Sequence, residues 1–385
     1  MGLTAHWGLW LVFFHLILTG RCNLECRYCF GEASDDFQGD DSGLSIDYDL
    51  PSRISYDVGD LAEFCRKDPD CVLTFYGGEP LLCLDDIKEI MDSVPARHFM
   101  MQTNGLLLNG LEPRYVNRFH TILVSIDGEE AVTDYFRGRG TYRRVIGKLR
   151  PLRENGFGGE LIARMTVMEP VDVFAQVRWL VENQEFPFGS VHWQLNAGFW
   201  KDDVKRSGFE DWIERSYNPG VQRLARYWVD QMEGKGRVLK MYPFLGIAGS
   251  FLSEEGKALL RCGGGWVNYA IQTDGNIIAC PTMWGIRDHY LGHIRSSDPN
   301  NLEKVFVGEP CTACEIIGIC GGRCLYTNIA KRWGPDRYEL VCRSVRNLVN
   351  AIVNEMPRIR RLIGEGLVRA EDFSYLRYNG CEIIP

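Results

Sequence analysis

The stretch "GRCNLECRYCFGE" at residues 20–32 places three cysteines within eight residues. Cys22, Cys26 and Cys29 stand at C-x3-C-x2-C spacing, directly after the apolar run "LWLVFFHLIL" at residues 9–18. A closed zinc site usually has a fourth cysteine or histidine, which this stretch lacks. An iron–sulfur cluster normally takes four thiolates, so three cysteines leave one iron open to a substrate or cofactor. We therefore expect a cluster with one open iron at the end of a buried strand.

The composition excludes several classes of protein. The chain has 385 residues, of which 45% are hydrophobic, and this is enough for a large core and two or three domains. Its formal net charge of −8 argues against nucleic acid or an anionic membrane as a partner. Residues 7–18 are too short for a membrane span and lack the positively charged start of a secretory signal. For a chain with fourteen cysteines, metal ligation in a reducing cytoplasm is therefore expected in place of a disulfide framework.

From the first cysteines to about Met232, the sequence alternates short apolar runs with longer amphipathic ones. Six strand–helix pairs of this kind predict a parallel sheet with helical crossovers. Reactive groups in such folds lie at the carboxyl ends of the strands, so the loops "TGRCN", "YGGEP", "QTNG", "SIDG" and "TVMEP" should face one pocket. The predicted strands are 12–19, 72–76, 98–103, 121–126, 160–167 and 191–197, and helices are predicted at 57–68, 82–94, 142–156 and 172–184.

These landmarks resemble the radical S-adenosylmethionine (SAM) superfamily. The resemblance implies a [4Fe–4S] cluster on the three cysteines, whose open iron binds the amino and carboxylate groups of SAM. Reductive cleavage of SAM then gives methionine and a 5'-deoxyadenosyl radical that abstracts a hydrogen atom.

The resemblance also assigns SAM contacts to this chain. Glu79 would accept a hydrogen bond from the ammonium group of SAM, Ser125 would reach the ribose, and Arg137, with Arg164 as a second candidate, would approach the carboxylate. The residues that the resemblance places at SAM are Tyr28, Gly77, Gly78, Glu79, Thr103, Asn104, Ser125, Arg137 and Arg164.

A second set of seven cysteines lies between residues 262 and 342. The motifs "CTAC" and "CGGRC" could each be half of a zinc ribbon, but seven thiols do not divide into two closed four-thiolate sites. Their spacing resembles the SPASM domain, which holds two auxiliary [4Fe–4S] clusters, so three clusters are expected in all. The resemblance assigns Cys311, Cys314, Cys320 and Cys342 to the outer cluster, and Cys262, Cys280 and Cys324 to the inner one.

The inner cluster is therefore expected to have either an open iron, which would bind a substrate thiolate, or a further ligand such as Cys381. Cys65, Cys71 and Cys83 lie beside core positions and are expected to be small buried hydrophobic residues. For Cys381, in the tail "NGCEIIP", an exposed thiol is the alternative to a cluster ligand or a residue of the radical pocket.

The predicted fold class is α/β. We expect a partial (β/α)6 TIM barrel at residues 1–235, a linker at 236–261 and a small, irregular, metal-organised SPASM domain at 262–345. A C-terminal helix and tail at 346–385 would complete the chain, with the helix starting near Ser344.

SPASM-bearing relatives mostly modify peptides or single residues of proteins, so a radical SAM oxidoreductase that oxidises a peptide is the leading hypothesis, with a thioether or other crosslink favoured. Pro281 follows the second SPASM cysteine, where sulfatase-maturing relatives have an aspartate, and this argues against formylglycine formation. No cobalamin-binding region is visible. Only 21 residues precede Cys22, so any leader would be bound by residues 202–256 or by a separate protein.

Two alternative functions remain open. One is radical modification, such as dehydrogenation, of a single residue in a large folded protein. The other is a non-catalytic iron–sulfur electron-transfer module. The expected partners of the enzyme are a peptide or protein substrate and a reduced ferredoxin-like or flavodoxin-like electron donor.

Overall fold

The computed structural model describes residues 11–29, 31, 37, 43–252, 259–381 and 384. The start of the first apolar run at residues 7–10, Phe30 and Glu32 of the cysteine stretch, and residues 253–258 of the predicted linker lie outside the described residues.

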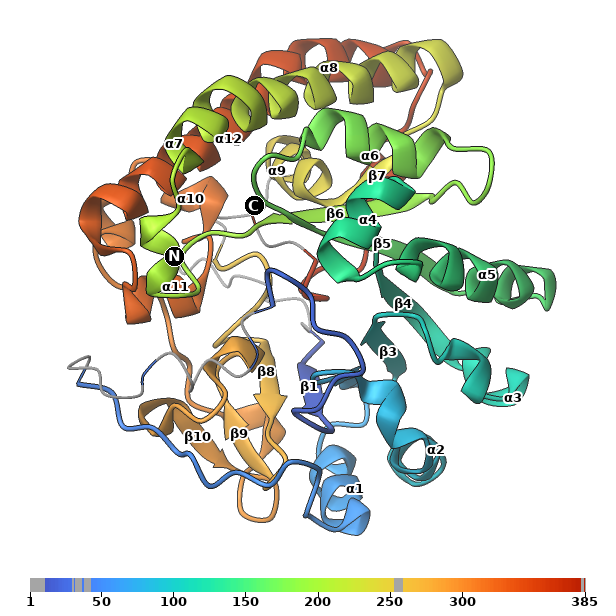
Figure 1. The fold of residues 1–385 in the computed structure, drawn as a ribbon, viewed down its shortest axis with the longest axis vertical. Coiled ribbons are helices and arrows are strands. Elements are labelled where there is room, and N and C mark those ends of the chain that lie inside the picture. The colour runs from blue at the N-terminus through green and yellow to red at the C-terminus, as the bar shows by residue number, and fades with distance from the viewer. Residues whose placement is uncertain are drawn as a thin grey trace, which may run out of the picture.

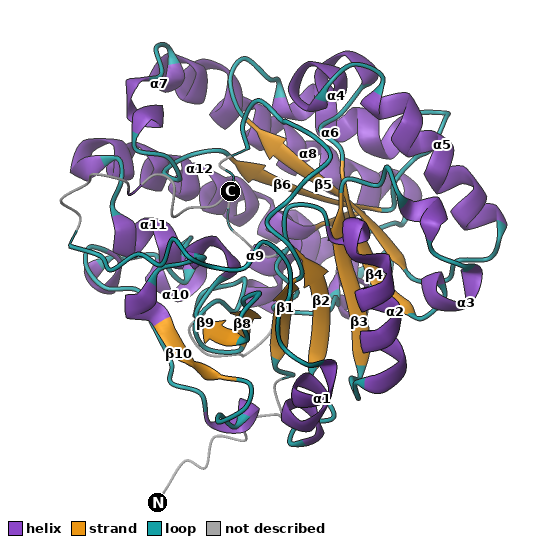
Figure 2. Ribbon diagram, turned by 60° about the horizontal axis from the view of Figure 1, so that its bottom comes forward, coloured by secondary structure: helices purple, strands orange, loops and turns teal. Residues whose placement is uncertain are grey.

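Six parallel strands form the centre of the fold, which confirms the predicted class (Figures 1 and 2). Each strand pairs with the next along the chain, as expected when helical crossovers connect parallel strands. The strands are β1 (Phe13–Ile17), β2 (Val72–Tyr76), β3 (His98–Thr103), β4 (Phe119–Ser125), β5 (Glu160–Val167) and β6 (Ser190–Leu195).

Helices follow the strands and cover the outer face of the sheet (Figure 1). Local sequence sets where several of them begin: the carboxylates of Asp57 and Asp172 accept hydrogen bonds from N–H groups in the first turns of α1 and α6. The helices of this part are α1 (Val58–Arg66), α2 (Leu84–Ser93), α3 (Pro113–Val116), α4 (Glu130–Arg137), α5 (Thr141–Glu154), α6 (Val173–Glu182), α7 (Phe209–Trp212), α8 (Asn218–Lys235) and α9 (Tyr242–Leu252).

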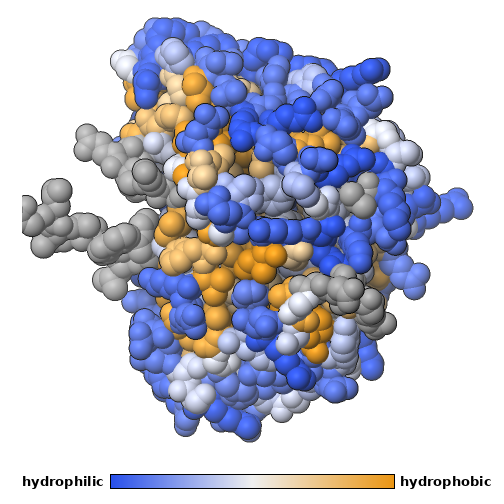
Figure 3. All heavy atoms as spheres, turned by 90° about the vertical axis from the view of Figure 1, so that its left-hand side faces the viewer, coloured by the Kyte–Doolittle hydropathy of each residue, from blue (hydrophilic) through white to orange (hydrophobic). Residues whose placement is uncertain are grey.

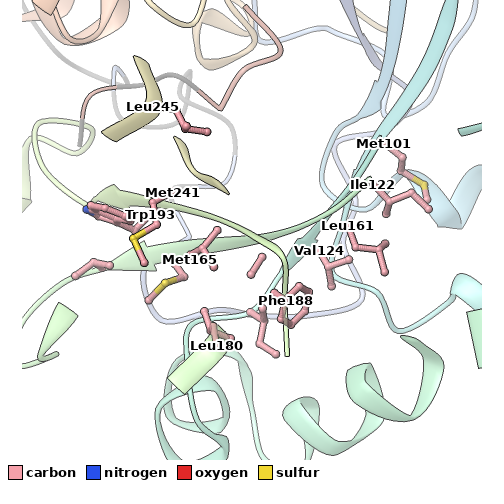
Figure 4. Close-up of a cluster of buried hydrophobic side chains, with 14 of the residues drawn as sticks. Met101, Ile122, Val124, Leu161, Met165, Leu180, Phe188, Trp193, Met241 and Leu245 are labelled. Atoms are coloured by element: carbon pink, nitrogen blue, oxygen red, sulfur yellow. The ribbon is translucent and has the colours of Figure 1, made fainter. Parts of the chain in front are cut away.

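The sheet curves far enough to enclose an interior. Side chains on its outer face, such as Met101, Val124 and Leu161, pack with Leu180 of α6 in one buried cluster (Figure 4). On the other face, Phe13, Val72, Met100, Leu123 and Ile162 form a second cluster. Phe13 and Ile162 come from β1 and β5, which are not neighbours in the sheet, so they meet only because the sheet closes toward a barrel.

The sheet continues beyond the six predicted strands. Strand β7 (Lys240–Met241) pairs with β6, and β8 (Asn268–Ile271) pairs in parallel with β1 on the other side. Strands β9 (Asn276–Ile278) and β10 (Tyr290–His293) extend the sheet beyond β8 by antiparallel pairing, so that β8, β9 and β10 follow one another outward from β1 in Figure 1. Strands β8, β9 and β10, which lie within the predicted metal-organised domain, therefore extend the barrel sheet, and the predicted domain boundaries stay predictions.

The C-terminal helix is longer than predicted. The sequence pattern predicted a start near Ser344, whereas α12 runs from Gly334 to Gly364 and thus carries Cys342 near its first turns. It packs along α8 and against α9 (Figure 1). Two shorter helices, α10 (Ile317–Cys320) and α11 (Leu325–Ala330), precede it among the second set of cysteines.

After α12 the chain returns to the barrel. Tyr375, Leu376 and Tyr378 pack against the inward cluster of Phe13 and Ile162, and Cys381 is fully buried within it. The interpretation of Cys381 as an exposed thiol is therefore wrong, because the tail fills the space that the curved sheet leaves at the amino ends of its strands.

Within the described residues, no helix combines the length and the apolar character that a membrane crossing requires. The face of the molecule in Figure 3 is largely hydrophilic, with hydrophobic residues gathered near its centre.

Candidate functional site

The first three cysteines lie close together on the loop that follows β1. Burial raises the pKa of the Cys26 thiol to about 11, with Arg137 opposing this effect and Cys29 and Cys22 adding to it. Burial also raises the pKa of Cys22, and the charge of Cys29 contributes. The loop turns tightly, because the N–H of Cys29 donates to the carbonyl of Cys26 at 2.9 Å. These contacts define a first thiol group of Cys22, Cys26 and Cys29.

Two glycines in the loop after β2 allow the backbone of that loop to pack against the cysteine loop. The N–H of Gly78 donates to the carbonyl of Thr19 at 2.8 Å, and the N–H of Glu79 donates to that of Arg21 at 2.9 Å. A Cβ atom at Gly77 or Gly78 would lie 2.3 Å from the carbonyl oxygen of Thr19 or Arg21, respectively. Gly77 also has a φ of +137°. Only glycine permits this approach of the two backbones.

We expect Gly78→Ala to displace the cysteine loop, because the added methyl group would overlap the backbone of Gly20 and Arg21. Such overpacking costs about 1–3 kcal/mol, and the displaced thiols would retain less iron. Thermal unfolding and iron content of the anaerobically reconstituted protein measure both effects. Gly147→Ala is the matched control, since a Cβ there meets open space on a helix. Equal behaviour of the two variants would contradict the role of Gly78.

Glu79 links the loops after β2 and β3. Its buried carboxylate accepts hydrogen bonds from the hydroxyl of Thr103 and the N–H of Asn104, both at 2.7 Å, and from the N–H of Leu81 at 3.0 Å. Burial nevertheless raises its pKa. The side chain of Asn104 points toward the cysteines, and its Nδ2 lies 3.8 Å from the Cys22 sulfur. The contact from Glu79 to the SAM ammonium stays a prediction, whereas its role in joining the two loops is visible in the geometry.

Tyr28 and Arg137 both donate hydrogen bonds to Asp127, which the sequence did not identify as a site residue. Asp127 accepts two hydrogen bonds from Arg137, at 2.7 and 2.9 Å, and one from the Tyr28 hydroxyl at 2.7 Å. The N–H of Thr166 adds a fourth at 3.0 Å. The Asp127–Arg137 pair is buried, and it ties the cysteine loop to β5 and α4. The feature of the sequence that could have identified Asp127 is its position as an acidic residue within "SIDG", directly after a buried strand.

Ser125 and Arg164 are level with each other on β4 and β5. Arg164 shares the inward face of Ile162, so its guanidinium lies inside the barrel. Its Nη1 is 2.6 Å from Nδ1 of His192, and its Nη2 donates to Gln194 at 2.6 Å. Arg137, in contrast, lies near Cys26. The two arginines therefore have different hydrogen-bond partners, although burial and the charge of Arg137 both lower the pKa of Arg164.

Three of the later cysteines form a second thiol group. Burial raises the pKa of Cys280 to about 12, with Cys324 contributing, and raises that of Cys262, with Cys280 and Cys324 contributing. The N–H of Gly264 donates to the Cys262 sulfur at 3.5 Å. Tyr76 is near both this group and the first one: burial raises its pKa to about 12, and Cys280 and Cys29 add to this effect.

The remaining four SPASM cysteines, Cys311, Cys314, Cys320 and Cys342, line one cavity of about 70 Å³. Burial raises the pKa of Cys342 to about 12, and Cys311 and Cys320 contribute. The Cys311 sulfur lies 3.2 Å from the Tyr338 hydroxyl, and Asn328 Nδ2 lies 3.4 Å from the same sulfur. Hydrogen bonds of this kind stabilise thiolate ligands. These four residues are the third thiol group.

In the part of the chain that the structure describes, no three Cys, His, Asp or Glu side chains converge to share a single metal ion. Four thiolates around a cubane cluster each bind a different iron and do not share one ion. Soft thiolate groups of three, three and four, the last around a cavity, fit iron–sulfur clusters by the chemistry of their donors.

The other four cysteines lie apart from these groups. Cys65, Cys71 and Cys83 are buried in the main core, as predicted. Cys381 lies within the apolar cluster of Phe13, Val72, Met100, Leu123 and Ile162, which is called the barrel floor below, and near Arg164 and Tyr242.

Comparisons with known proteins agree with this geometry. The model of the radical SAM superfamily matches residues 16–173. The pre-heme d1 synthase of Dinoroseobacter shibae is 32% identical over 158 residues, which are 40% of this chain and 35% of that protein. The radical SAM cyclopropyl synthase TigE of Paramaledivibacter caminithermalis is 21% identical over 350 residues, which are 84% of this chain and 69% of that protein. The chain thus spans about a third of the first relative's length and about two thirds of the second's.

A solved structure shares the fold over nearly the whole chain. Native anSMEcpe with bound AdoMet and Cp18Cys peptide superposes with a TM-score of 0.66 at 16% identity, covering 92% of this chain and 99% of that one. The family match runs from the end of β1 through β5 and includes the three-cysteine loop, so residues 16–173 form a radical SAM domain, and the fold shared with the solved structure extends through the later cysteines.

Proposed function

We propose that this enzyme oxidatively modifies a polypeptide inside the barrel and that the product is a thioether or another crosslink. The observation that carries the proposal is the division of ten thiols into groups of three, three and four. One three-thiol group lies at the carboxyl end of β1, where parallel barrels place their chemistry.

The expected cofactors are inferred from the residues that would bind them. Cys22, Cys26 and Cys29 would hold the cluster that binds SAM, and bound SAM supplies a 5'-deoxyadenosyl radical when a reduced ferredoxin-like or flavodoxin-like donor provides the electron. The backbone of Gly77 and Gly78, with Thr103, Asn104 and Ser125, would line the SAM site. Asp127 holds Arg137 and Tyr28 in place beside Cys26.

Two auxiliary clusters would occupy the second and third thiol groups. Cys311, Cys314, Cys320 and Cys342 supply four thiolates, which is a complete ligand set. Cys262, Cys280 and Cys324 supply three, and the position of Cys381 on the barrel floor favours an open iron over a fourth ligand from this residue. An open iron beside the radical site would bind and orient a substrate thiolate, which favours thioether formation.

The relatives support a polypeptide substrate. The native anSMEcpe structure, which shares the fold of this chain, holds AdoMet together with a peptide, and TigE is a radical SAM cyclopropyl synthase. Dehydrogenation of one residue in a large folded protein is the second candidate.

High-resolution mass spectrometry tests this function after anaerobic co-expression with any small peptide encoded beside the gene. We expect the peptide to lose about two hydrogens, and a Cys26→Ala enzyme to leave it unchanged. An unchanged mass in both ordinary and deuterated water would exclude oxidation and solvent-quenched epimerisation of that peptide and favour a protein substrate. Absence of 5'-deoxyadenosine from the reduced enzyme would instead favour an electron-transfer module.

Cys342→Ala is expected to affect an auxiliary cluster and to leave the first cluster intact. Loss of one thiolate in the third group should remove about four irons per chain and abolish product, while 5'-deoxyadenosine still forms. Iron analysis and chromatography of the reaction mixture measure the two effects. Cys83→Ala, at a buried cysteine outside the three groups, is the control and should keep its full iron content. Unchanged iron in Cys342→Ala would exclude its role as a ligand.

A further inference from the structure

Polar side chains form a cluster inside the barrel, closer to the carboxyl ends of the strands than the apolar residues of the barrel floor. His15 on β1, Tyr76 on β2, Arg164 on β5, and His192 and Gln194 on β6 all belong to inward-facing rows of their strands. The ring centroids of His15 and Tyr76 lie 5.4 Å apart, and Arg164 is level with His192 on the neighbouring strand. The charge of Arg164 acts on both His15 and Tyr76, although β5 pairs with neither β1 nor β2.

The strand residues around Arg164 in this cluster are neutral, and the Cys381 thiol acts on its charge from the apolar end of the barrel. An arginine only donates hydrogen bonds, so His192 accepts at Nδ1 and carries its proton on Nε2. Burial lowers the pKa of His15 to about 4, and its Nδ1 lies 2.9 Å from the side-chain oxygen of Asn268. Burial raises the pKa of Tyr76 to about 12, so its phenol stays protonated. Arg137, the other cation of this region, is paired with Asp127.

Arg164 therefore brings a positive charge into the barrel without a carboxylate partner among the described residues. Its Nε is buried and makes no hydrogen bond, although two other N–H groups of the same guanidinium are bound. A buried charged donor left unpaired destabilises a fold, and such groups are retained mainly where a ligand completes them. Bidentate binding of a carboxylate is the interaction that a guanidinium favours most.

We propose that Arg164, positioned by His192 and Gln194, binds a carboxylate of the polypeptide substrate: an aspartate or glutamate side chain, or the C-terminal carboxylate. This inference rests on the proposed function and adds a requirement, namely that the substrate places an acidic group inside the barrel next to the site of reaction. Arg164 lies three residues before the end of β5, whereas Arg137 lies beside Cys26, so Arg137 is the better placed of the two for the carboxylate of SAM.

The experiment uses the reconstituted holoenzyme and its Arg164→Met and Arg164→Lys variants. The probes are sodium acetate and its neutral analogue acetamide, each compared with sodium chloride at equal ionic strength. We expect acetate, and not acetamide, to raise the melting temperature of the wild type, because a ligand that binds only the folded state stabilises it. Arg164→Lys should keep part of this response and Arg164→Met should lose it.

Two further readouts separate this proposal from other roles of Arg164. Arg164→Met should melt at the same temperature as the wild type or higher, and it should bind SAM within about threefold of the wild-type Kd. An acetate response that persists in Arg164→Met would reject the site, as would a lowered melting temperature combined with no acetate response in the wild type. A tenfold or greater loss of SAM affinity would assign the bound carboxylate to SAM. Formation of 5'-deoxyadenosine by the wild type, measured in the same preparation, tests the proposed function independently.

Discussion

Cys26→Ala is expected to abolish 5'-deoxyadenosine formation, with a loss of at least about 10³-fold, equivalent to about 4 kcal/mol at the transition state. The physical reason is the ligand count: the first group has only three thiolates, so loss of one leaves two to hold a four-iron cluster. Anaerobic incubation of the reduced variant with SAM, followed by quantification of 5'-deoxyadenosine, measures the loss directly.

Cys65→Ala provides the control for this experiment. Cys65 is fully buried in the main core and belongs to none of the three thiol groups. Its replacement should lower stability modestly and leave SAM cleavage intact. Cleavage that survives in Cys26→Ala, or that disappears equally in both variants, would contradict the assignment of the first cluster.

Asp127→Asn is expected to lower the free energy of unfolding by about 3–5 kcal/mol, because it leaves the buried Arg137 without a compensating charge. The carboxylate also receives hydrogen bonds from Tyr28 and Thr166, so the cysteine loop should lose its attachment to β5. Denaturant unfolding of the variant, together with iron content, measures both consequences.

Two comparisons make this prediction specific. Asp202→Asn removes an ion pair with Lys205 in which both side chains are exposed, and it should change stability by less than about 0.5 kcal/mol. The double variant Asp127→Asn with Arg137→Met removes both buried partners, so it should be more stable than Asp127→Asn alone. Equal stability of the two single variants would show that the buried pair does not hold the loop.

Much of the fold could be predicted because it depends on local pattern. Apolar runs such as residues 72–76 and 98–103 matched β2 and β3 in both bounds, since a strand buried on both faces has a continuous apolar sequence. Side-chain capping of helix starts, as at Asp57 and Asp172, is equally local. The prediction was less accurate at the start of α12, where ten residues beyond the apolar pattern are helical because they pack beside the third thiol group.

The candidate site was predictable only where spacing along the chain carries the chemistry. The C-x3-C-x2-C motif and the two glycines of "YGGEP" can be recognised from a few consecutive residues. The reason is that a single loop carries the three thiols, and the neighbouring loop carries the glycines that let the two backbones approach. Asp127 was missed, since its importance comes from Arg137, Tyr28 and Thr166 on three other segments.

The sequence by itself determined the strand and helix pattern, the residue types of the thiol groups and the glycines that let two loops touch. Only the tertiary structure decided that Arg164 faces His15 and Tyr76, that Cys381 lies on the barrel floor, and that β8 continues the sheet beside β1. The reason is physical. Periodicity records which face of a segment is apolar, whereas contacts between segments more than a hundred residues apart depend on how far the sheet curves and on which strand closes beside β1.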